Sequence, residues 1–142
     1  GKNSKDIMKH IMVNGAYDIL HVGHIDLINY AKSLGDYLLV ALDTDERIAY
    51  NKGKDRPVNN LKTRMTIIRN LKAVDEVQCF GSDAELINLF KTFKPDVRVI
   101  GSDWQDKIIV GSEYSGEIIF YERKDENSTT KTLENYVNRR RM

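Results

Sequence analysis

The hydrophobic run Ile11-Met12-Val13-Asn14-Gly15-Ala16-Tyr17 and the motif His21-Val22-Gly23-His24 that follows it decide the fold class. The run predicts a β-strand, and apolar residues at helical spacing predict a helix from about Gly23 through Leu34. The two imidazoles are three residues apart, so they lie on one face of the first helical turn and can point at one anion. Exposed amides at the helix start add positive potential there. The motif therefore indicates a phosphate site at a strand-to-helix junction.

The rest of the chain alternates predicted strands with predicted helices. We expect an N-terminal arm over residues 1–10 and one domain over 11–142. Within the domain, a polar stretch begins at Asp43 and ends in a basic loop with Gly and Pro, residues 52–59, that is expected to be mobile. Such alternation predicts an α/β fold, a Rossmann-like parallel sheet with helices on both faces. Further strands are expected at 37–42, 74–80, 97–100 and 117–121, and further helices at 61–71, 83–93 and 129–140.

Bulk composition limits the classes of partner. The chain has 142 residues, with 22 Lys and Arg against 21 Asp and Glu, so its charge demands neither nucleic acid nor an anionic membrane. It shows no 18-residue apolar run and no signal-like segment, and we therefore expect a soluble cytoplasmic protein. The single Cys79 cannot form an internal disulfide, and its strand-like context favours a small half-buried residue over a nucleophile.

The candidate motifs follow four predicted strands. His21 and His24 follow the first strand, Asp43 and Asp45 the second, and the segments 101–104 and 123–130 two later ones. Ligands of open parallel sheets bind beyond the carboxyl ends of the strands, so these loops are expected to converge on one crevice. The Ser and Thr residues of 128–130 also predict the cap of the last helix, with hydroxyls and amides available to an anion.

The segment around the two histidines resembles the signature of the nucleotidyltransferase superfamily that includes the cytidylyltransferases. Tyr17 stands where that signature usually has Phe. A second segment, from Arg123 to Thr130, resembles the family's Arg-Thr-x-Gly-Ile-Ser-Thr-Thr string, with Lys124 and Glu126 in place of Thr and Gly. The resemblance covers roughly residues 11–132. The residues at positions of the first signature are Gly15, Tyr17, Asp18, His21, Gly23 and His24.

Two subfamilies are suggested by different segments. The stretch 101–104, Gly-Ser-Asp-Trp, resembles glycerol-3-phosphate cytidylyltransferases, whereas 52–59 with Arg64, and 109–113, resemble heptose-1-phosphate adenylyltransferases. We favour transfer of CMP from CTP to a small phosphorylated polyol such as glycerol 3-phosphate. The alternative is adenylyl transfer to a heptose 1-phosphate. A third reading, from another class, is a non-catalytic nucleotide-binding module, which the departures at Lys124 and Glu126 support.

The resemblance implies direct transfer, in which an acceptor phosphate oxygen attacks the α-phosphorus of a nucleoside triphosphate and expels pyrophosphate. Catalysis is then positioning and charge stabilisation. The expected catalytic residues are His21, His24, Arg123 and Lys52, with His24 stabilising the transition state. Mg²⁺ is expected to arrive with the triphosphate, because the phosphates supply most of its ligands.

The remaining expectations concern binding. The resemblance implies a homodimer, and we expect no protein-built metal site, no nucleic acid partner and no membrane partner. The expected acceptor-binding residues are Lys54, Arg56 and Trp104. The expected nucleotide-binding residues are Gly15, Ala16, Tyr17, Asp18, Gly23, Asp45, Arg64, Gly101, Asp103, Ser128 and Thr129.

Overall fold

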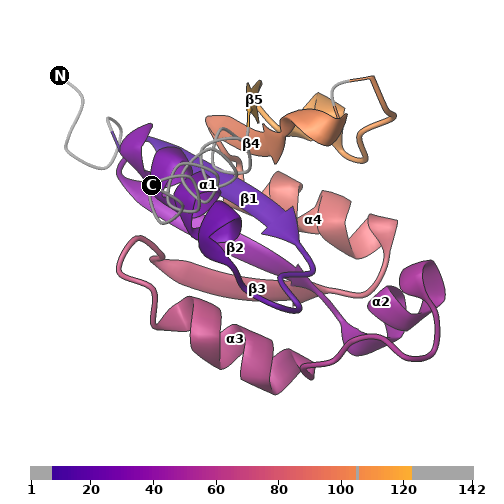
Figure 1. The fold of residues 1–142 in the computed structure, drawn as a ribbon. Coiled ribbons are helices and arrows are strands. Elements are labelled where there is room, and N and C mark those ends of the chain that lie inside the picture. Colours follow the sequence, from indigo (N-terminus) through magenta and orange to yellow (C-terminus); the bar gives the residue numbers. More distant parts are fainter. Residues whose placement is uncertain (1–7, 105, 123–142) are drawn as a thin grey trace, which may run out of the picture.

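A five-stranded sheet forms the centre of the protein, as seen in a computed structural model that describes residues 8–104 and 106–122 (Figure 1). The strands lie in the order β3-β2-β1-β4-β5, and every neighbouring pair is parallel. The α/β prediction is therefore confirmed. The strands are β1 (His10–Gly15), β2 (Tyr37–Asp43), β3 (Glu76–Phe80), β4 (Val97–Gly101) and β5 (Glu117–Tyr121).

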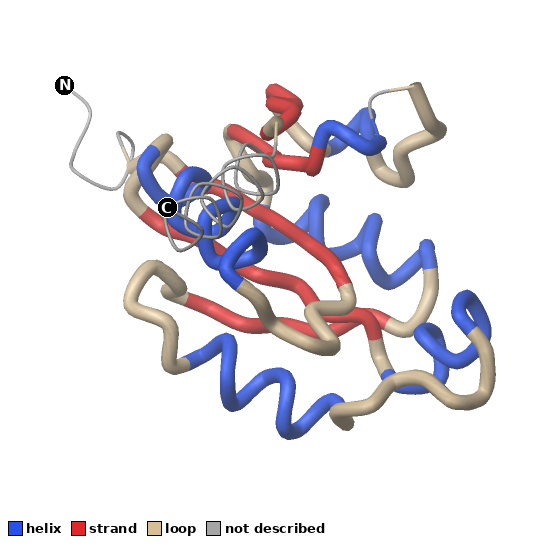
Figure 2. Tube along the Cα trace, viewed as in Figure 1, coloured by secondary structure: helices blue, strands red, loops and turns tan. Residues whose placement is uncertain are grey.

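Helices cover both faces of the sheet, as predicted (Figures 1 and 2). Helices α1 and α3 pack on one face and α4 packs on the other. None of the helices in the described part of the chain is long and apolar enough to cross a membrane. The helices are α1 (Val22–Ser33), α2 (Asp45–Lys52), α3 (Leu61–Arg69) and α4 (Asp83–Phe93), with short 3₁₀ turns η1 (Ser102–Trp104) and η2 (Ser112–Tyr114).

Strand β2 divides the core into two clusters. Leu38, Val40 and Leu42 pack toward α1 and α3, while Leu39 and Ala41 pack toward α4. All five are at most 1% exposed. A strand covered on both faces has no polar side to alternate with, which explains its continuous apolar run. The carboxyl ends of β1 and β2 are thereby held rigidly beside each other.

The segment 43–59 differs from its prediction as a loop, because its first part forms α2. Thr44 caps this helix by accepting a hydrogen bond from the Arg47 amide at 3.3 Å, and Asp45 and Glu46 occupy the first turn. Only Ile48 is buried. A helix with one buried residue has no apolar stripe, so its periodicity is invisible in the sequence.

The other element boundaries differ from the prediction by at most two residues. Strand β1 begins at His10, which the sequence assigned to the arm, and ends at Gly15 because Tyr17 adopts a left-handed conformation, φ 47°. Strand β3 begins at Glu76, two residues later than predicted. Cys79 is exposed there rather than half-buried, since β3 is the edge strand. The predicted helix 129–140 lies outside the described residues.

Candidate active site

A cavity of about 740 Å³ opens at the carboxyl ends of β1, β2 and β4. Its walls come from the loop after β1, from α2, and from the segment that follows β4. Sites for small ligands typically measure roughly 300–1,000 Å³, so this cavity has room for a nucleotide and a small acceptor. Among the residues predicted to bind or react, those that line it are Gly15, Ala16, Tyr17, Asp18, His24, Lys52, Arg56, Gly101, Asp103 and Trp104.

The two histidines form the N-terminal cap of α1. His21 Nδ1 accepts a hydrogen bond from the Gly23 amide at 3.0 Å, and His24 Nδ1 accepts one from the His21 amide at 3.2 Å. This is a capping box built from imidazoles instead of Ser and Glu. Because each Nδ1 accepts a proton, each neutral ring carries its own proton on Nε2, on the opposite side of the ring. Of the two side chains, His24 lines the cavity.

Tyr17 lies between the tight turn and His24. Its ring meets the His24 ring edge-on, with centroids 5.2 Å apart. A Cβ at Gly15 would come within 3.1 Å of the Tyr17 ring, so glycine leaves room for the aromatic side chain to fold back over the turn. The His21 and His24 rings are 3.9 Å apart. The orientation of His24 is thus constrained by its cap bond and by two neighbouring rings.

Asp18 joins the loop after β1 to the segment 56–59. Its carboxylate accepts hydrogen bonds from the amides of Asn59, at 2.8 Å, and Val58, at 2.9 Å, and pairs with Arg56 at 3.2 Å. Burial by itself raises the pKa of the Asp18 carboxyl, but these amides and the guanidinium outweigh it and hold the pKa below its ordinary value. Asp18 is therefore ionised and, in the wall of the cavity, holds the segment 56–59 against the loop after β1.

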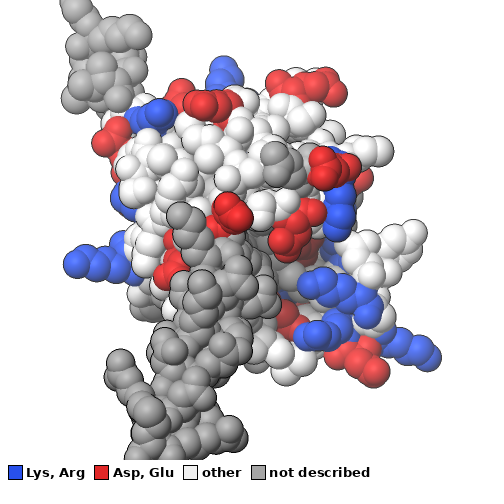
Figure 3. Space-filling model, turned by 45° about the horizontal axis from the view of Figure 1, so that its top comes forward, with Lys and Arg blue, Asp and Glu red and all other residues white. Residues whose placement is uncertain are grey.

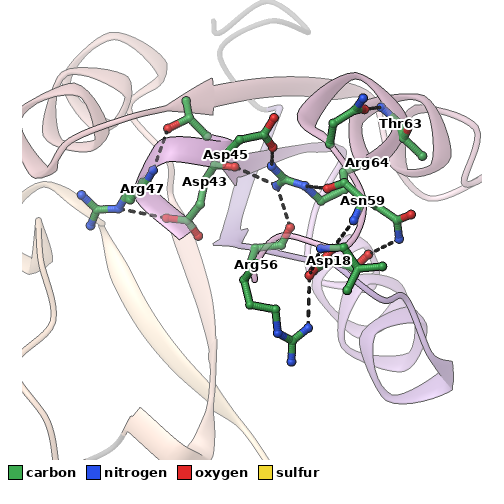
Figure 4. Close-up of polar contacts among 12 residues, drawn as sticks. Asp18, Asp43, Asp45, Arg47, Arg56, Asn59, Thr63 and Arg64 are labelled. Atoms are coloured by element: carbon green, nitrogen blue, oxygen red, sulfur yellow. Dashed lines mark hydrogen bonds and ion pairs between the residues drawn. The ribbon is translucent and has the colours of Figure 1, made fainter. Parts of the chain in front are cut away.

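The side chain of Arg64 is fully buried and is a second link between these loops. Figure 4 shows its polar contacts. The guanidinium donates hydrogen bonds to the carbonyls of Ala16, Asp43 and Asn59 at 2.7–2.9 Å, and it pairs with Asp45 at 2.7 Å. One side chain thereby ties α3 to three other segments. Arg64 and Asp45 were expected to bind the nucleotide. In the structure they bind each other in this network, and neither lines the cavity.

Basic side chains stand along one side of the cavity. Lys52, at the end of α2, and Arg56 are both exposed and both line it. Figure 3 shows Lys and Arg side chains gathered on the side of the molecule that carries α2 in Figure 1, with acidic side chains among them. Deeper in, Arg47 is held by Asp43 at 2.9 Å and Asp83 at 2.6 Å.

The comparison with protein families agrees with the motif and its geometry. The model of the family described as cytidylyltransferase-like matches residues 12–138, almost the entire chain. The chain belongs to the cytidylyltransferase-like family. The nucleotidyltransferase resemblance drawn from the two histidines is therefore confirmed at the level of the family.

Curated relatives of this cytidylyltransferase-like chain carry the name "Bifunctional protein HldE". The protein from Helicobacter hepaticus is 41% identical over 126 residues, and that from Campylobacter fetus subsp. fetus is 42% identical over 123. These alignments cover 89% and 87% of this chain but 26% and 27% of the relatives. The chain thus spans about a quarter of the length of the curated relatives it matches.

Solved structures share the fold. A protein titled lipopolysaccharide core biosynthesis protein, from Thermoplasma volcanium, superposes with a TM-score of 0.67 at 26% identity, covering 83% of this chain and 99% of that one. A pantoate-beta-alanine ligase from Francisella tularensis gives a TM-score of 0.59 at 20% identity, covering 81% and 59%. The second likeness concerns the fold alone.

Other positions of the cytidylyltransferase-like site depart from the sequence analysis. His21, Gly23 and Lys54 do not line the cavity, and Arg123, Ser128 and Thr129 lie outside the described residues. The sequence analysis missed several lining residues. Asp43, which the sequence placed at the end of its strand beside the crevice, does line the cavity, whereas Asn14 and Arg98 lie within apolar strands and gave no signal. The missed polar lining residues are Asn14, Arg47, Asn51 and Arg98.

Proposed function

We propose that this chain transfers an adenylyl group from ATP to a heptose 1-phosphate or a closely similar sugar phosphate, with release of pyrophosphate. One observation carries the proposal: His24, at the capped start of α1, faces the same cavity as the basic side chains Lys52 and Arg56. Phosphoryl chemistry of this kind asks a protein for positioned donors and positive charge more than for a covalent nucleophile.

In this proposal the histidine, lysine and arginine side chains of the cavity have different roles. The Nε2 proton of His24 stabilises the charge that grows on the transferring phosphate, and its Nδ1 remains bound to the cap. Lys52 neutralises the triphosphate as a point charge, while Arg56 is available to the acceptor as a planar fork. Arg123, Ser128 and Thr129 stay in the proposal as triphosphate-binding residues on the strength of the second motif alone.

The choice of substrates rests on two supports. The loop 52–59 and the stretch 109–113 resemble heptose-1-phosphate adenylyltransferases, and the curated relatives are named HldE. Both favour this alternative over the CTP and glycerol 3-phosphate reading, which rested on the 101–104 stretch. Trp104 of that stretch does line the cavity, but it is 51% exposed. Its ring lies against Lys107, whose Nζ is 5.1 Å from the ring centroid, a distance at which a cation is attracted to the ring face.

Mg²⁺ enters the proposal with the triphosphate. Within the described residues, no three side chains of His, Cys, Asp or Glu are grouped so as to hold a metal ion. Asp18 already accepts two amide hydrogen bonds, and Asp43 pairs with Arg47. These residues fit an ion whose ligands are mainly phosphate oxygens and water. When bound, the ion would neutralise phosphate charge.

The homodimer that the resemblance implies stays a separate prediction.

The test measures pyrophosphate release with ATP and with CTP, each combined with heptose 1-phosphate or glycerol 3-phosphate. We expect turnover with ATP and heptose 1-phosphate. His24→Ala should lower kcat at least ~100-fold, as loss of one charge-stabilising donor does elsewhere, while ATP still binds. Turnover only with CTP and glycerol 3-phosphate would restore the other reading. Triphosphate binding without turnover in any combination would favour the non-catalytic module.

A further inference from the structure

A buried arginine that the proposed mechanism does not use lies on the wall of the same cavity. Its neighbours in β4, Val97 and Val99, pack into the cluster beneath α1, so Arg98 points to the opposite face, toward α4. The residue is 4% exposed. Its guanidinium carbon lies 4.5 Å from the centre of the Phe90 ring.

The hydrogen bonds of Arg98 leave part of the guanidinium unused. Nη1 donates to the carbonyl of Val110 at 2.7 Å and to Ser115 Oγ at 3.1 Å, and Nη2 donates to Asn14 Oδ1 at 2.9 Å. Nε is buried and has no hydrogen-bond partner among the residues that the structure describes. A guanidinium carries five N–H groups, so Nε–H and one Nη2–H remain. Those two donors can share one edge of the fork, the edge that grips two oxygens of a phosphate.

The charge of Arg98 is also unmatched. None of the ion pairs within residues 8–104 and 106–122 includes it, and all of its polar partners are neutral. Burial lowers its pKa to about 10, so the side chain still carries its charge at neutral pH. A buried charge without a counter-charge is costly, and a ligand anion would supply what the protein does not.

The bonds to Val110 and Ser115 do not explain the charge. They fasten the turn that contains η2, and Ser115 Oγ continues the chain of bonds to the carbonyl of Gly111 at 2.7 Å. Neutral donors could also make these bonds, and the Phe90 ring, 4.5 Å from the guanidinium carbon, attracts the cation only weakly. No anion among the described residues balances the charge of Arg98.

Sheet order places this cation on a definite side of the site. In the order β2-β1-β4, the loop that leads to His24 lies in the middle, with Lys52 following β2 on one side and Arg98 in β4 on the other. Asn14, the partner of Arg98, directly precedes Gly15, the last residue of β1 before that loop. In a direct displacement, the attacking oxygen and the leaving oxygen lie on opposite sides of the phosphorus.

We infer that Arg98, oriented by Asn14, binds the phosphate of the acceptor and so determines which acceptors are used. The inference rests on the proposed nucleotidyl transfer, because it assigns Arg98 to one of the two substrates. It takes this role in place of Lys54, which does not line the cavity. The ligand class is a phosphate monoester, and inorganic phosphate is its simplest probe.

The first experiment titrates inorganic phosphate calorimetrically into protein whose nucleotide site is filled with a non-hydrolysable triphosphate analogue. Arg98→Met should weaken phosphate binding at least tenfold and leave the affinity for the analogue within twofold. Lys52→Met should do the reverse. Ser115→Ala loosens the same turn without touching the charge, so it should keep phosphate affinity within threefold of the wild-type protein.

Asn14→Asp gives an independent test that does not depend on the stability of Arg98→Met. It places a carboxylate of nearly the same shape 2.9 Å from the guanidinium, where Asn14 Oδ1 now lies. Phosphate binding should be lost while Tm holds or rises, because the missing counter-charge is then built in. Phosphate affinity unchanged in Asn14→Asp or Arg98→Met, or lost equally in Ser115→Ala, would overturn the inference.

The two proposals fail in different ways. If the analogue does not bind and no pyrophosphate is released, the proposed function fails, whereas phosphate titration of the unliganded variants still reports on Arg98. If turnover occurs and Arg98→Met leaves the KM for the acceptor unchanged, the inference about Arg98 fails alone. Wild-type protein that binds no phosphate overturns it as well.

Discussion

An imidazole has two nitrogens on opposite sides of its ring, and His21 and His24 use them for different tasks. Each Nδ1 accepts an amide proton at the start of α1, so the ring proton of each neutral imidazole is on Nε2. Two amides at the helix start are therefore satisfied by the rings themselves. In the proposed function, the phosphates would therefore meet the ring protons rather than these two amides, which the sequence analysis had expected to bind the anion.

Because His21 caps α1, two substitutions at this position should differ in their effect on stability. His21→Ala should lower the free energy of unfolding by about 1 kcal/mol, because the Gly23 amide loses its acceptor. His21→Asn, which restores a good N-cap side chain, should recover most of that stability. Urea unfolding measures both variants. Equal loss in the alanine and asparagine variants would show that the ring does not act as a cap.

Replacing Arg64 should cost much more stability than replacing an exposed arginine of the same helix. Arg64→Met leaves three carbonyls and the Asp45 carboxylate without their donor, and breaking a buried charged network typically costs roughly 3–5 kcal/mol. Arg69→Met, on an exposed part of the same helix, should stay within about 0.5 kcal/mol of wild type. Similar urea midpoints for the two variants would contradict the role of Arg64.

At the scale of elements, the segment 56–59 depends on one carboxylate. The folded state lowers the pKa of Asp18 from its ordinary value of 3.8, so the unfolded chain binds a proton more readily. The resulting stability is complete above the unfolded pKa and is lost as the pH falls through the folded pKa. The clamp therefore weakens in acid and not in base.

Asp18→Asn should test this dependence. The variant should be less stable than wild type at neutral pH, and the difference in urea midpoint should shrink as the pH falls below about 4. Asp106→Asn, which changes an exposed carboxylate, should show no such convergence. A difference between wild type and Asp18→Asn that is constant from pH 7 to pH 3 would refute the clamp.

The elements themselves were largely predictable. Strands buried on both faces, such as β2, are continuous apolar runs, and α4 shows both an apolar stripe and a Ser82 cap. Helix α2 was not predictable, because a helix with a single buried residue shows no periodic spacing of apolar residues in the sequence. Strand ends were displaced where side chains intervene, as at Asp75, whose carboxylate accepts the Leu38 amide at 2.8 Å. Such contacts join residues far apart in the sequence.

For the whole molecule, strand order decides which loops meet. The sequence motifs placed His24, Lys52, Asp103 and Trp104 near one crevice, and all four line the cavity. What no motif could show is that Arg64 turns inward while Arg56 stays at the surface. Both are basic residues near the same loop, and the difference depends on carbonyls supplied by three other segments.

A ligand that fills this cavity should stabilise the entire domain. Binding to the native state at 100 times Kd adds about 2.7 kcal/mol to the free energy of unfolding. We expect ATP with Mg²⁺ to raise Tm more than CTP with Mg²⁺ at equal concentration, and Lys52→Met to reduce the shift. Differential scanning fluorimetry measures this directly. An equal or larger shift with CTP would count against the adenylyl donor.

The buried network around Arg64 also affects how random variants of this protein would score in two kinds of screen. Scored by the yield of intact protein in cells, position 64 would tolerate substitution as poorly as a leucine in the sheet. Scored by product formation, it would stand beside His24 and look like a substrate contact. Only the two screens together would separate Arg64, which holds the loops in place, from His24, which is proposed to meet the phosphate.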